Sequence, residues 1–398
     1  MPRSRGLVLA ASLVLLCAAA ARAEDITVNV FEDVPDADAF DGVCDANLSV
    51  DGLQCSLRAA IQHANATPGE DRIIVPAGLY RLRLRGDGEN AGATGDLDIT
   101  DDVLIEGAGA GETIVDAKKA KDRVFDVLGS ARATISGLTL RSGKAPATES
   151  GGGVRCLGAE TTVANCAILK CRAGDDAGGI DVQGGTVYVF DTWIDRCKAK
   201  DDGGAMDVDG GEVVIQRCAF TRNRAKSEGG GIENSGSFVS IQNSTISANK
   251  ARGSGGISLE DGGVLGLDFC TIAKNKAKSG GGIDTSDIQF GTNTADAFAT
   301  IFEKNRKGNC RGGLNSASYC VDSDGTCELS GRGNVSGASA RLLKLANNGG
   351  PTPTHALRDD SPARDLVPST EESCPDTDQR GTPRPSSCSA GAWQAELP

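Results

Sequence analysis

The stretch NKAKSGGGID (residues 275–284) places two lysines on alternate residues, followed by three glycines, an isoleucine and an aspartate. Two related stretches precede it, NRAKSEGGGIE (residues 223–233) and NKARGSGGIS (residues 249–258). Their leading asparagines are spaced by 26 residues (249 − 223 = 275 − 249 = 26). A fixed period with the same class of residue at each position is the signature of a protein built from stacked coils.

Apolar residues repeat with the same period. One such column contains Ile168, Ile194, Phe220, Ile246, Ile272 and, after a four-residue insertion, Phe302. Within each coil, alternation with period two, β-branched residues and glycine punctuation favour short strands over helices. Equivalent positions of neighbouring coils would then stack about 4.8 Å apart. The sequence therefore predicts an all-β parallel solenoid of about 26 residues per coil, with a core in which each Ile or Val contributes ~1.5–3 kcal/mol.

Each coil also pairs a glycine motif with an asparagine motif, as in GGAM (residues 203–206) and FTRN (residues 220–223). This pair resembles the repeat of the polymorphic outer-membrane proteins over about residues 130–310. The resemblance implies a right-handed parallel β-helix of the pectin-lyase-like class. Two coils depart from the pattern, because Cys171 and Cys197 stand in the asparagine position.

The N-terminal stretch CSLRAAIQHANA (residues 55–66) resembles the Cys-Ser-Leu-Arg-Glu-Ala segment of exported bacterial proteins. Its apolar residues share one face of a short helix, which we expect to cover the open end of the β-tube. Ser56 is a natural N-cap. Ala59 replaces the glutamate of the family, so the capping box is lost.

The ends of the chain predict export. Arg3 and Arg5 precede an apolar run and a small-residue motif that ends at Ala23, which is the pattern of a cleaved signal peptide. No later apolar stretch is long enough to span a bilayer, so we expect a secreted, cell-surface or outer-membrane protein without its own transmembrane segment. The stretch NNGGPTPTHAL (residues 347–357) and its surroundings resemble a C-terminal domain of exported bacterial repeat proteins. The predicted regions are a signal peptide (1–23), an N-terminal cap with a helix (24–70), the β-helix (71–309) and a disulfide-containing C-terminal cap (310–398).

Export permits disulfides. The sequence has 14 cysteines, and removal of the signal peptide with Cys17 leaves 13, so at least one thiol has no partner within the chain. Three predicted pairs flank short loops, and a fourth joins adjacent coils at a Cα separation of about 4.8 Å, which a disulfide accepts. These pairs are Cys44–Cys55, Cys310–Cys327, Cys374–Cys388 and Cys171–Cys197. Cys166, Cys218 and Cys270 lie two coils apart and are expected to be buried thiols.

Two basic columns flank a column of alanines. The first contains Arg172, Lys198, Arg224, Lys250 and Lys276, and the second contains Lys200, Lys226, Arg252 and Lys278. Alternation places alanine inside and both basic columns outside, where adjacent charges repel by about 0.9 kcal/mol in water. One interpretation is a solvated surface balanced by acidic neighbours. The other is a ligand-binding groove for an anionic polysaccharide or another cell-surface component. Nucleic acid is not an expected partner, because the net charge is −13 and aromatic residues make up 4% of the chain.

An acidic column follows the glycines and contains Asp181, Asp207 and Glu233. It is interpreted as a second solvated surface, with a Ca²⁺ site as the alternative because stacked carboxylates offer hard oxygen ligands. These acids are also the candidate catalytic residues, because the pectin-lyase-like class includes lyases and hydrolases of acidic polysaccharides. Against catalysis, the acids recur with the repeat and neither histidine lies within it, and a fold alone does not carry an activity. We therefore expect a non-catalytic scaffold without a cofactor, with a polysaccharide lyase or hydrolase as the alternative.

Overall fold

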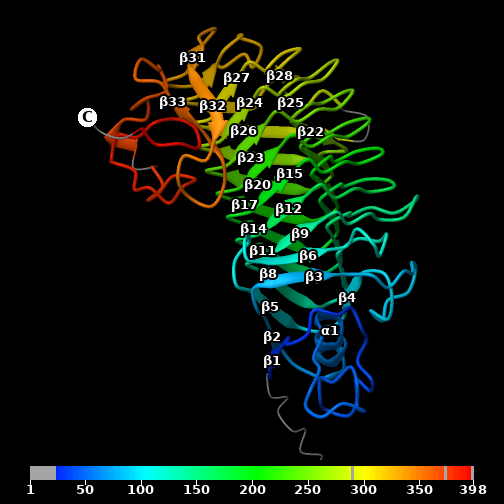
Figure 1. The fold of residues 1–398 in the computed structure, drawn as a ribbon. Coiled ribbons are helices and arrows are strands. Elements are labelled where there is room, and N and C mark those ends of the chain that lie inside the picture. Colours follow the sequence, from blue (N-terminus) through cyan, green and yellow to red (C-terminus); the bar gives the residue numbers. More distant parts are fainter. Residues whose placement is uncertain (1–23, 288–290, 372–373, 396–398) are drawn as a thin grey trace, which may run out of the picture.

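The coils of the protein stack in one continuous column. The computed structural model describes residues 24–287, 291–371 and 374–395, so the predicted signal peptide lies outside the described residues. Within this part of the chain, three parallel sheets of eleven, nine and eleven strands run along the column (Figure 1). Except for β1–β2 and β30–β31 at the two ends, neighbours in each sheet are three strands apart in the chain, since each full coil contributes one strand to each sheet. The predicted all-β parallel solenoid is confirmed.

The first sheet contains β1 (Asp25–Thr27), β2 (Asp71–Val75), β5 (Val103–Gly107), β8 (Arg132–Ser136), β11 (Glu160–Ala164), β14 (Thr186–Phe190), β17 (Glu212–Gln216), β20 (Phe238–Gln242), β23 (Val264–Asp268), β26 (Thr294–Phe298) and β29 (Ser316–Ser318). The second contains β4 (Leu97–Ile99), β7 (Phe125–Leu128), β10 (Val154–Leu157), β13 (Ile180–Gln183), β16 (Met206–Asp209), β19 (Ile232–Ser235), β22 (Ile257–Glu260), β25 (Ile283–Asp284) and β28 (Cys310–Arg311). The third contains β3 (Gly78–Arg81), β6 (Thr113–Asp116), β9 (Thr139–Arg141), β12 (Ala167–Leu169), β15 (Trp193–Asp195), β18 (Ala219–Thr221), β21 (Thr245–Ser247), β24 (Thr271–Ala273), β27 (Ile301–Glu303), β30 (Val321–Asp322) and β31 (Val335–Ser336).

The apolar columns form the interior of the tube. In the third sheet Ile194 pairs with Phe220, and Phe220 pairs with Ile246, so the predicted column is in register. All three side chains are fully buried. Parallel pairing also extends beyond the predicted limits of 71 and 309, since it begins at β1 and continues to β31.

The asparagine column is a buried hydrogen-bonded ladder. Asn249 Nδ2 donates to the carbonyl of Phe220 in the preceding coil (2.9 Å), and Asn249 Oδ1 accepts from the backbone N–H of Asn223 (2.9 Å). The same pair of bonds recurs at Asn275. Each asparagine therefore satisfies two peptide groups at a bend that would otherwise be buried without partners.

The glycines form the bends between coils. Gly229 has a φ of +52°, which favours glycine, and a Cβ at Gly230 would lie 2.5 Å from the carbonyl oxygen of Gly255 in the next coil. The glycine runs therefore permit a close approach of neighbouring loops.

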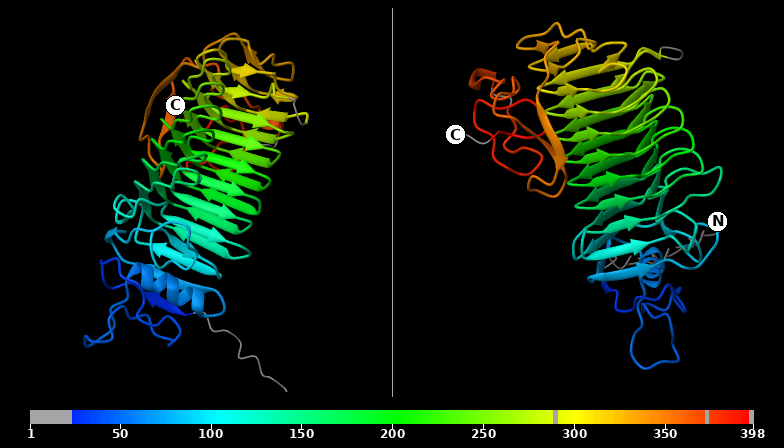
Figure 2. Two further views of the ribbon diagram at one scale, coloured as in Figure 1. Left: turned by 90° about the vertical axis from the view of Figure 1, so that its right-hand side faces the viewer. Right: turned by 45° about the horizontal axis from the view of Figure 1, so that its top comes forward.

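A short helix closes the N-terminal end of the column. Helix α1 (Leu57–Ala66) begins after Ser56, whose Oγ accepts a hydrogen bond from the N–H of Ala59 (3.0 Å), as the N-cap prediction requires. The helix packs against β2 and β4 of the first coil (Figure 2). No helix in the described ranges is long and apolar enough to cross a membrane.

The C-terminal region lies on the side of the column, where a cap over its end was expected. The antiparallel strands β32 (Leu342–Ala346) and β33 (Thr354–Leu357) and the short 3₁₀ helix η1 (Ser369–Glu371) belong to it. Thr245 Oγ1 donates to Gln379 Oε1 (2.6 Å), and the side chain of Ser247 hydrogen-bonds to His355 (2.9 Å). The region therefore covers the outer face of the third sheet (Figures 1 and 2), where Ile301 and Val321 also belong to one apolar cluster with Leu357 and Val367.

The structure contains three of the four predicted disulfides, Cys44–Cys55, Cys310–Cys327 and Cys374–Cys388. The predicted Cys171–Cys197 disulfide is absent, and both residues are buried free thiols. Side chains of in-register coils point the same way, so their Cβ atoms stay about 4.8 Å apart, whereas a disulfide needs about 3.5–4.5 Å. The thiol of Cys197 instead lies 3.5 Å from the carbonyl oxygen of Ile168. As expected, Cys166, Cys218 and Cys270 are also buried thiols.

We predict that Asn249→Ala lowers the free energy of unfolding by about 2–5 kcal/mol, because the Phe220 carbonyl and the Asn223 N–H would both lose their buried partner. Asn249→Cys is the matched control, since cysteine occupies the same column at Cys171 and Cys197, and its loss should be smaller. Urea denaturation monitored by circular dichroism gives both values. Equal stability of Asn249→Ala and the parent chain would show that the ladder is not stabilising.

Thiol titration tests the correction at Cys171 and Cys197. For a chain that begins at residue 24, we predict no rapid reaction in the folded state, since burial raises the pKa of thiols such as Cys218 to about 12. Seven thiols should react after unfolding without a reductant, because three disulfides use six of the 13 cysteines (13 − 6 = 7). A count of five would indicate that Cys171 and Cys197 are bridged.

Candidate functional site

The two predicted basic columns follow the third sheet, at the bend that leads to the glycine loops. Arg224 forms parallel backbone bridges with Lys198 and Lys250, and the same pairing continues at both ends to Lys144 and Arg306. The nine predicted basic side chains are exposed, whereas the alanines between them are buried. The alternation of the sequence therefore produces two parallel rows of cations above an alanine floor.

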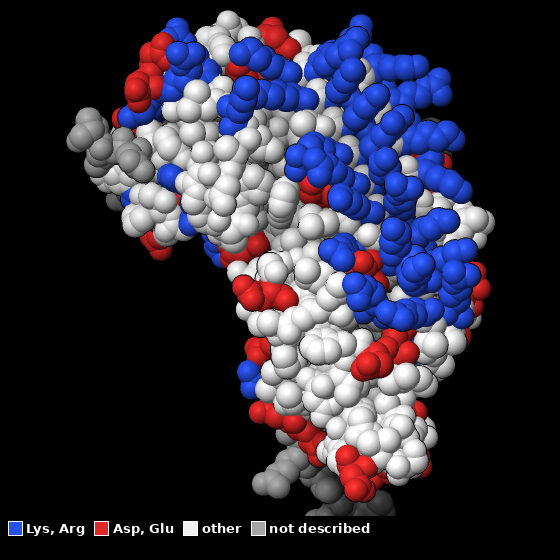
Figure 3. Space-filling model, viewed as in Figure 1, with Lys and Arg blue, Asp and Glu red and all other residues white. Residues whose placement is uncertain are grey.

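These rows line the groove that we call the basic groove, with a volume of about 640 Å³. Figure 3 shows the Lys and Arg side chains gathered in a band that runs along the coils. The basic groove is lined by Arg224, Ala225, Lys226, Lys250, Ala251, Arg252, Lys276, Ala277, Lys278, Arg306 and Lys307. Arg172, Lys198 and Lys200 extend the same two rows toward the N-terminus.

None of the nine predicted cations forms an ion pair with any residue that the structure describes. The acids of the adjacent loops have other partners. Asp176 accepts a hydrogen bond from the backbone N–H of Asp202 (2.8 Å), and Glu228 accepts one from the N–H of Ser254 (2.6 Å). The acidic side chains that were expected to balance the basic columns therefore do not contact them directly. These loop carboxylates instead accept hydrogen bonds from the backbone of the neighbouring loop.

The basic face has a third row that the sequence analysis missed. Lys170, Arg196, Arg222, Lys274 and Lys304 each follow a strand of the third sheet and have φ values between +54° and +59°. Part of this row is neutralised, since Arg222 pairs with Asp195 (2.7 Å) and Lys304 pairs with Glu303 (2.9 Å). The 26-residue spacing from Lys170 to Arg196 and Arg222 was the signal that could have revealed it.

The acidic column lies in the second sheet and is buried, contrary to the expected solvated surface. Asp181 pairs in register with Asp207, and Asp207 pairs with Glu233. Their exposed fractions are 1%, 8% and 5%. The glycine loops fold over them so closely that a Cβ at Gly203 would lie 2.6 Å from the Cβ of Asp207. The absence of side chains in these loops is therefore what permits burial of the acids.

Burial changes the protonation of this ladder. Burial raises the pKa of Asp181 to about 7, against a hydrogen bond from Gln183 that lowers it. Burial and mutual repulsion also raise the pKa values of Asp207 and Glu233 well above their usual range. Two adjacent buried carboxyl groups do not both ionise readily, so we expect them to share a proton near neutral pH.

The three acids stack along the second sheet, one in each of three successive coils. Among the described residues, two sets of three acidic side chains each bring one oxygen per residue within 4.8 Å of the others. These sets are Asp96, Asp98 and Asp126, which are buried, and Asp175, Asp176 and Asp201, which lie in exposed loops. The Ca²⁺ prediction at Asp181, Asp207 and Glu233 stays untested, and the buried set of Asp96, Asp98 and Asp126 was not predicted.

A second groove, of about 410 Å³, opens beside the end of the ladder. We call it the acidic groove, and it is lined by Glu228, Ser258, Leu259, Glu260, Asp284, Ser286, Asp287 and Arg311. Burial, together with neighbouring acids, raises the pKa of Glu260 in this groove to about 7. Arg311 pairs there with Asp284 (3.0 Å).

The ladder predicts a pH dependence of stability. The folded chain holds the Asp181 proton to about pH 7, whereas an unfolded aspartate loses it near pH 3.8, so this contribution to stability is full below pH 3.8 and is lost as the pH rises through 7. Asp181→Asn should make the loss of stability between pH 4 and pH 8 smaller by on the order of 2–4 kcal/mol. The exposed Asp209→Asn is the control and should follow the parent chain. Urea denaturation at several pH values would contradict the assignment if both variants behaved alike.

The coil geometry agrees with the comparison to known families. The family model described as the right-handed β-helix region matches residues 124–322, which is half of the 398 residues. No curated protein and no solved structure matches the chain. This protein therefore belongs to the right-handed β-helix family.

Proposed function

We propose that this protein is an exported, non-catalytic β-helix scaffold whose basic groove binds an anionic polysaccharide. The observation that carries the proposal is the set of nine exposed Lys and Arg side chains, which lie in two in-register rows and have no ion pairs with any described residue. These cations are gathered on one surface although the whole chain has a net charge of −13. Cations repeated at about 4.8 Å repel one another, and an anionic ligand that spans several coils relieves this repulsion.

A polymeric ligand fits the shape of the basic groove better than a compact one. The first row extends over five coils, from Arg172 to Lys276, so a long ligand could contact several coils at once. Guanidinium and ammonium groups donate charge-assisted hydrogen bonds to carboxylate and sulfate oxygens. The lining contains no aromatic residue on which nucleobases could stack, which favours a glycan over a single-stranded nucleic acid.

The burial of the acidic ladder supports a binding role over catalysis at Asp181, Asp207 and Glu233. A catalytic carboxyl group must come within hydrogen-bonding reach of the bond that it cleaves. The glycine loops stand between these acids and a polymer outside the coil. The alternative of a lyase or hydrolase is supported by one feature, the acidic groove, where Glu260 and Arg311 are accessible from solvent.

Charge reversal in the basic groove tests the binding role. We predict that Lys250→Glu combined with Lys276→Glu weakens binding to a sulfated polysaccharide at least tenfold, which corresponds to about 1.4 kcal/mol. The salt dependence should also become shallower, because fewer charges are matched. Lys344→Glu combined with Arg358→Glu is the control, since both residues are exposed, lie in the C-terminal region and change the net charge equally. Fluorescence anisotropy with a labelled glycan at several salt concentrations gives these values.

Equal weakening by both double variants would indicate attraction by net charge alone and would contradict a specific groove. A parallel assay for unsaturated sugars and reducing ends, with and without Ca²⁺, addresses the alternative. Product release that is abolished by Glu260→Gln would replace the scaffold by an enzyme acting at the acidic groove.

A further inference from the structure

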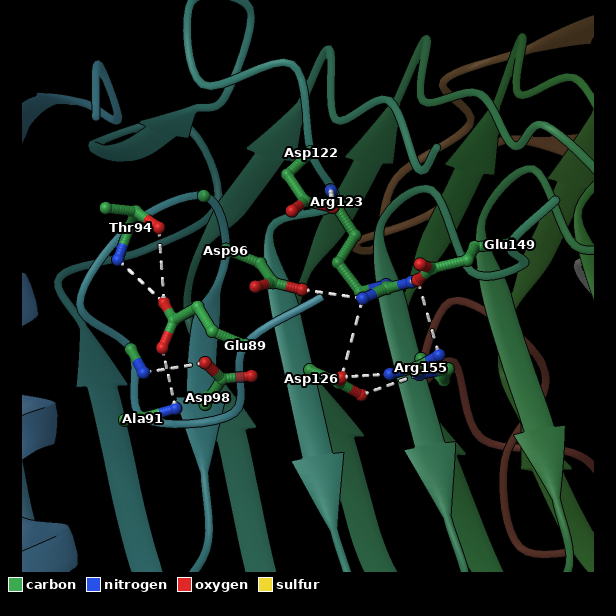
Figure 4. Close-up of polar contacts among 12 residues, drawn as sticks. Glu89, Ala91, Thr94, Asp96, Asp98, Asp122, Arg123, Asp126, Glu149 and Arg155 are labelled. Atoms are coloured by element: carbon green, nitrogen blue, oxygen red, sulfur yellow. Dashed lines mark hydrogen bonds and ion pairs between the residues drawn. The ribbon is translucent and has the colours of Figure 1, made fainter. Parts of the chain in front are cut away.

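Three buried carboxyl groups face one another in the first coils, far along the chain from the basic groove. Asp98 on β4 pairs in register with Asp126 on β7, and Asp96 immediately precedes β4. One oxygen from each of the three lies within 4.8 Å of the others. Figure 4 shows them arranged around a common space beside the loop that carries Glu89.

One oxygen at this cluster has no partner. Asp98 is fully buried, and its Oδ2 accepts a hydrogen bond from the backbone N–H of Gly92 (2.7 Å). Its Oδ1 is also buried and has no hydrogen-bond partner. In Figure 4 this second oxygen is directed toward Asp126. A buried acceptor without a partner is rare in folded proteins, so it indicates a group that completes the site.

The arginines of the cluster contact Asp96 and Asp126 and, within the described part of the chain, leave Asp98 without a cationic partner. Arg123 contacts Asp96 (2.7 Å) and Asp126 (3.4 Å), and Arg155 forms two bonds to Asp126. Among the described residues, neither arginine forms a hydrogen bond or an ion pair with Asp98. Five acidic side chains surround two guanidinium groups, so the acidic groups outnumber the arginines by three (5 − 2 = 3). The acids are Asp96, Asp98, Asp122, Asp126 and Glu149.

We propose that Asp96, Asp98 and Asp126 bind one Ca²⁺ ion. The donor set consists of hard oxygen atoms, and no histidine or thiol joins it, which favours Ca²⁺ or Mg²⁺ over a transition metal. Ca²⁺ fits better, because it tolerates irregular geometry, whereas Mg²⁺ demands a near-ideal octahedron that two fixed arginines would obstruct. The loop set of Asp175, Asp176 and Asp201 lacks a buried oxygen without a partner and carries no such proposal.

The position of the ion would link the helix to the β-tube. Arg58 of α1 is buried and donates to the carbonyl oxygens of Gly92 (2.8 Å), Gly95 (2.9 Å) and Asp96 (2.8 Å). The loop that holds Asp98 through Gly92 is therefore the same loop that holds the helix. Ca²⁺ bound only by the folded chain would stabilise this end of the column by mass action.

Calorimetric titration of Ca²⁺ into chelator-treated full-length protein tests the proposal. We expect one ion per chain with a Kd of about 10⁻⁴–10⁻³ M, as in extracellular modules, and weaker binding of Mg²⁺. Asp98→Asn should weaken Ca²⁺ binding at least tenfold. Asp175→Asn is the matched control in the exposed loop set and should leave the Kd unchanged. Unchanged binding by Asp98→Asn, loss of binding by Asp175→Asn, or no binding by the parent chain would each overturn the proposal.

Hydrogen exchange of the parent chain provides a test that does not depend on the folding of a variant. With Ca²⁺, amides of residues 57–66 and 91–99 should exchange more slowly than with a chelator, while residues 245–273 should be unaffected. Slower exchange confined to residues 174–177 and 200–203 would place the ion at the loop set and refute the assignment.

Discussion

The structure depends on in-register parallel stacking, which places each residue directly above its equivalent in the preceding coil. At a spacing of about 4.8 Å, a buried residue must be compatible with a neighbour of its own kind. Apolar residues satisfy this requirement by packing, as in the column of Ile194, Phe220 and Ile246. Asparagine satisfies it because its side chain is both donor and acceptor, so the side chain of Asn249 hydrogen-bonds to Phe220 in the preceding coil and to Asn275 in the next. Charged residues do not satisfy it, since equal charges repel.

The two kinds of charged column respond to this repulsion differently. The basic residues have long side chains that reach solvent, so their charged groups are exposed above Ala225 and Ala251. The acidic residues have short side chains beneath the glycine loops, and their repulsion is reduced by retaining protons. One repeat thus produces a basic surface and an interior whose charge depends on pH.

The sequence was sufficient for features that obey the period and insufficient for those that do not. The apolar core, the asparagine column and the alternation of alanine with basic residues are periodic, and each follows from the strand geometry. The burial of Asp207 depends on the path of the loop at Gly203, which the period does not specify. The cluster of Asp98 and Asp126 lies where the spacing is irregular, because 28 residues separate them and 29 separate Asp126 from Arg155. The lateral position of the C-terminal region depends on a tertiary contact between distant parts of the chain.

That lateral position has a mechanical consequence. In a simple solenoid each repeat interacts only with its neighbours, so the end coil can fray without disturbing the others. Here Thr352 bonds to the carbonyl of Arg217, Gln379 bonds to Thr245, and Ala392 bonds to Thr271, so one segment is fastened to three successive turns. Such a brace resists peeling, since a turn cannot detach until the fastening beside it has released. A pulling force on this end of the molecule would therefore meet a unit of several turns that yields together.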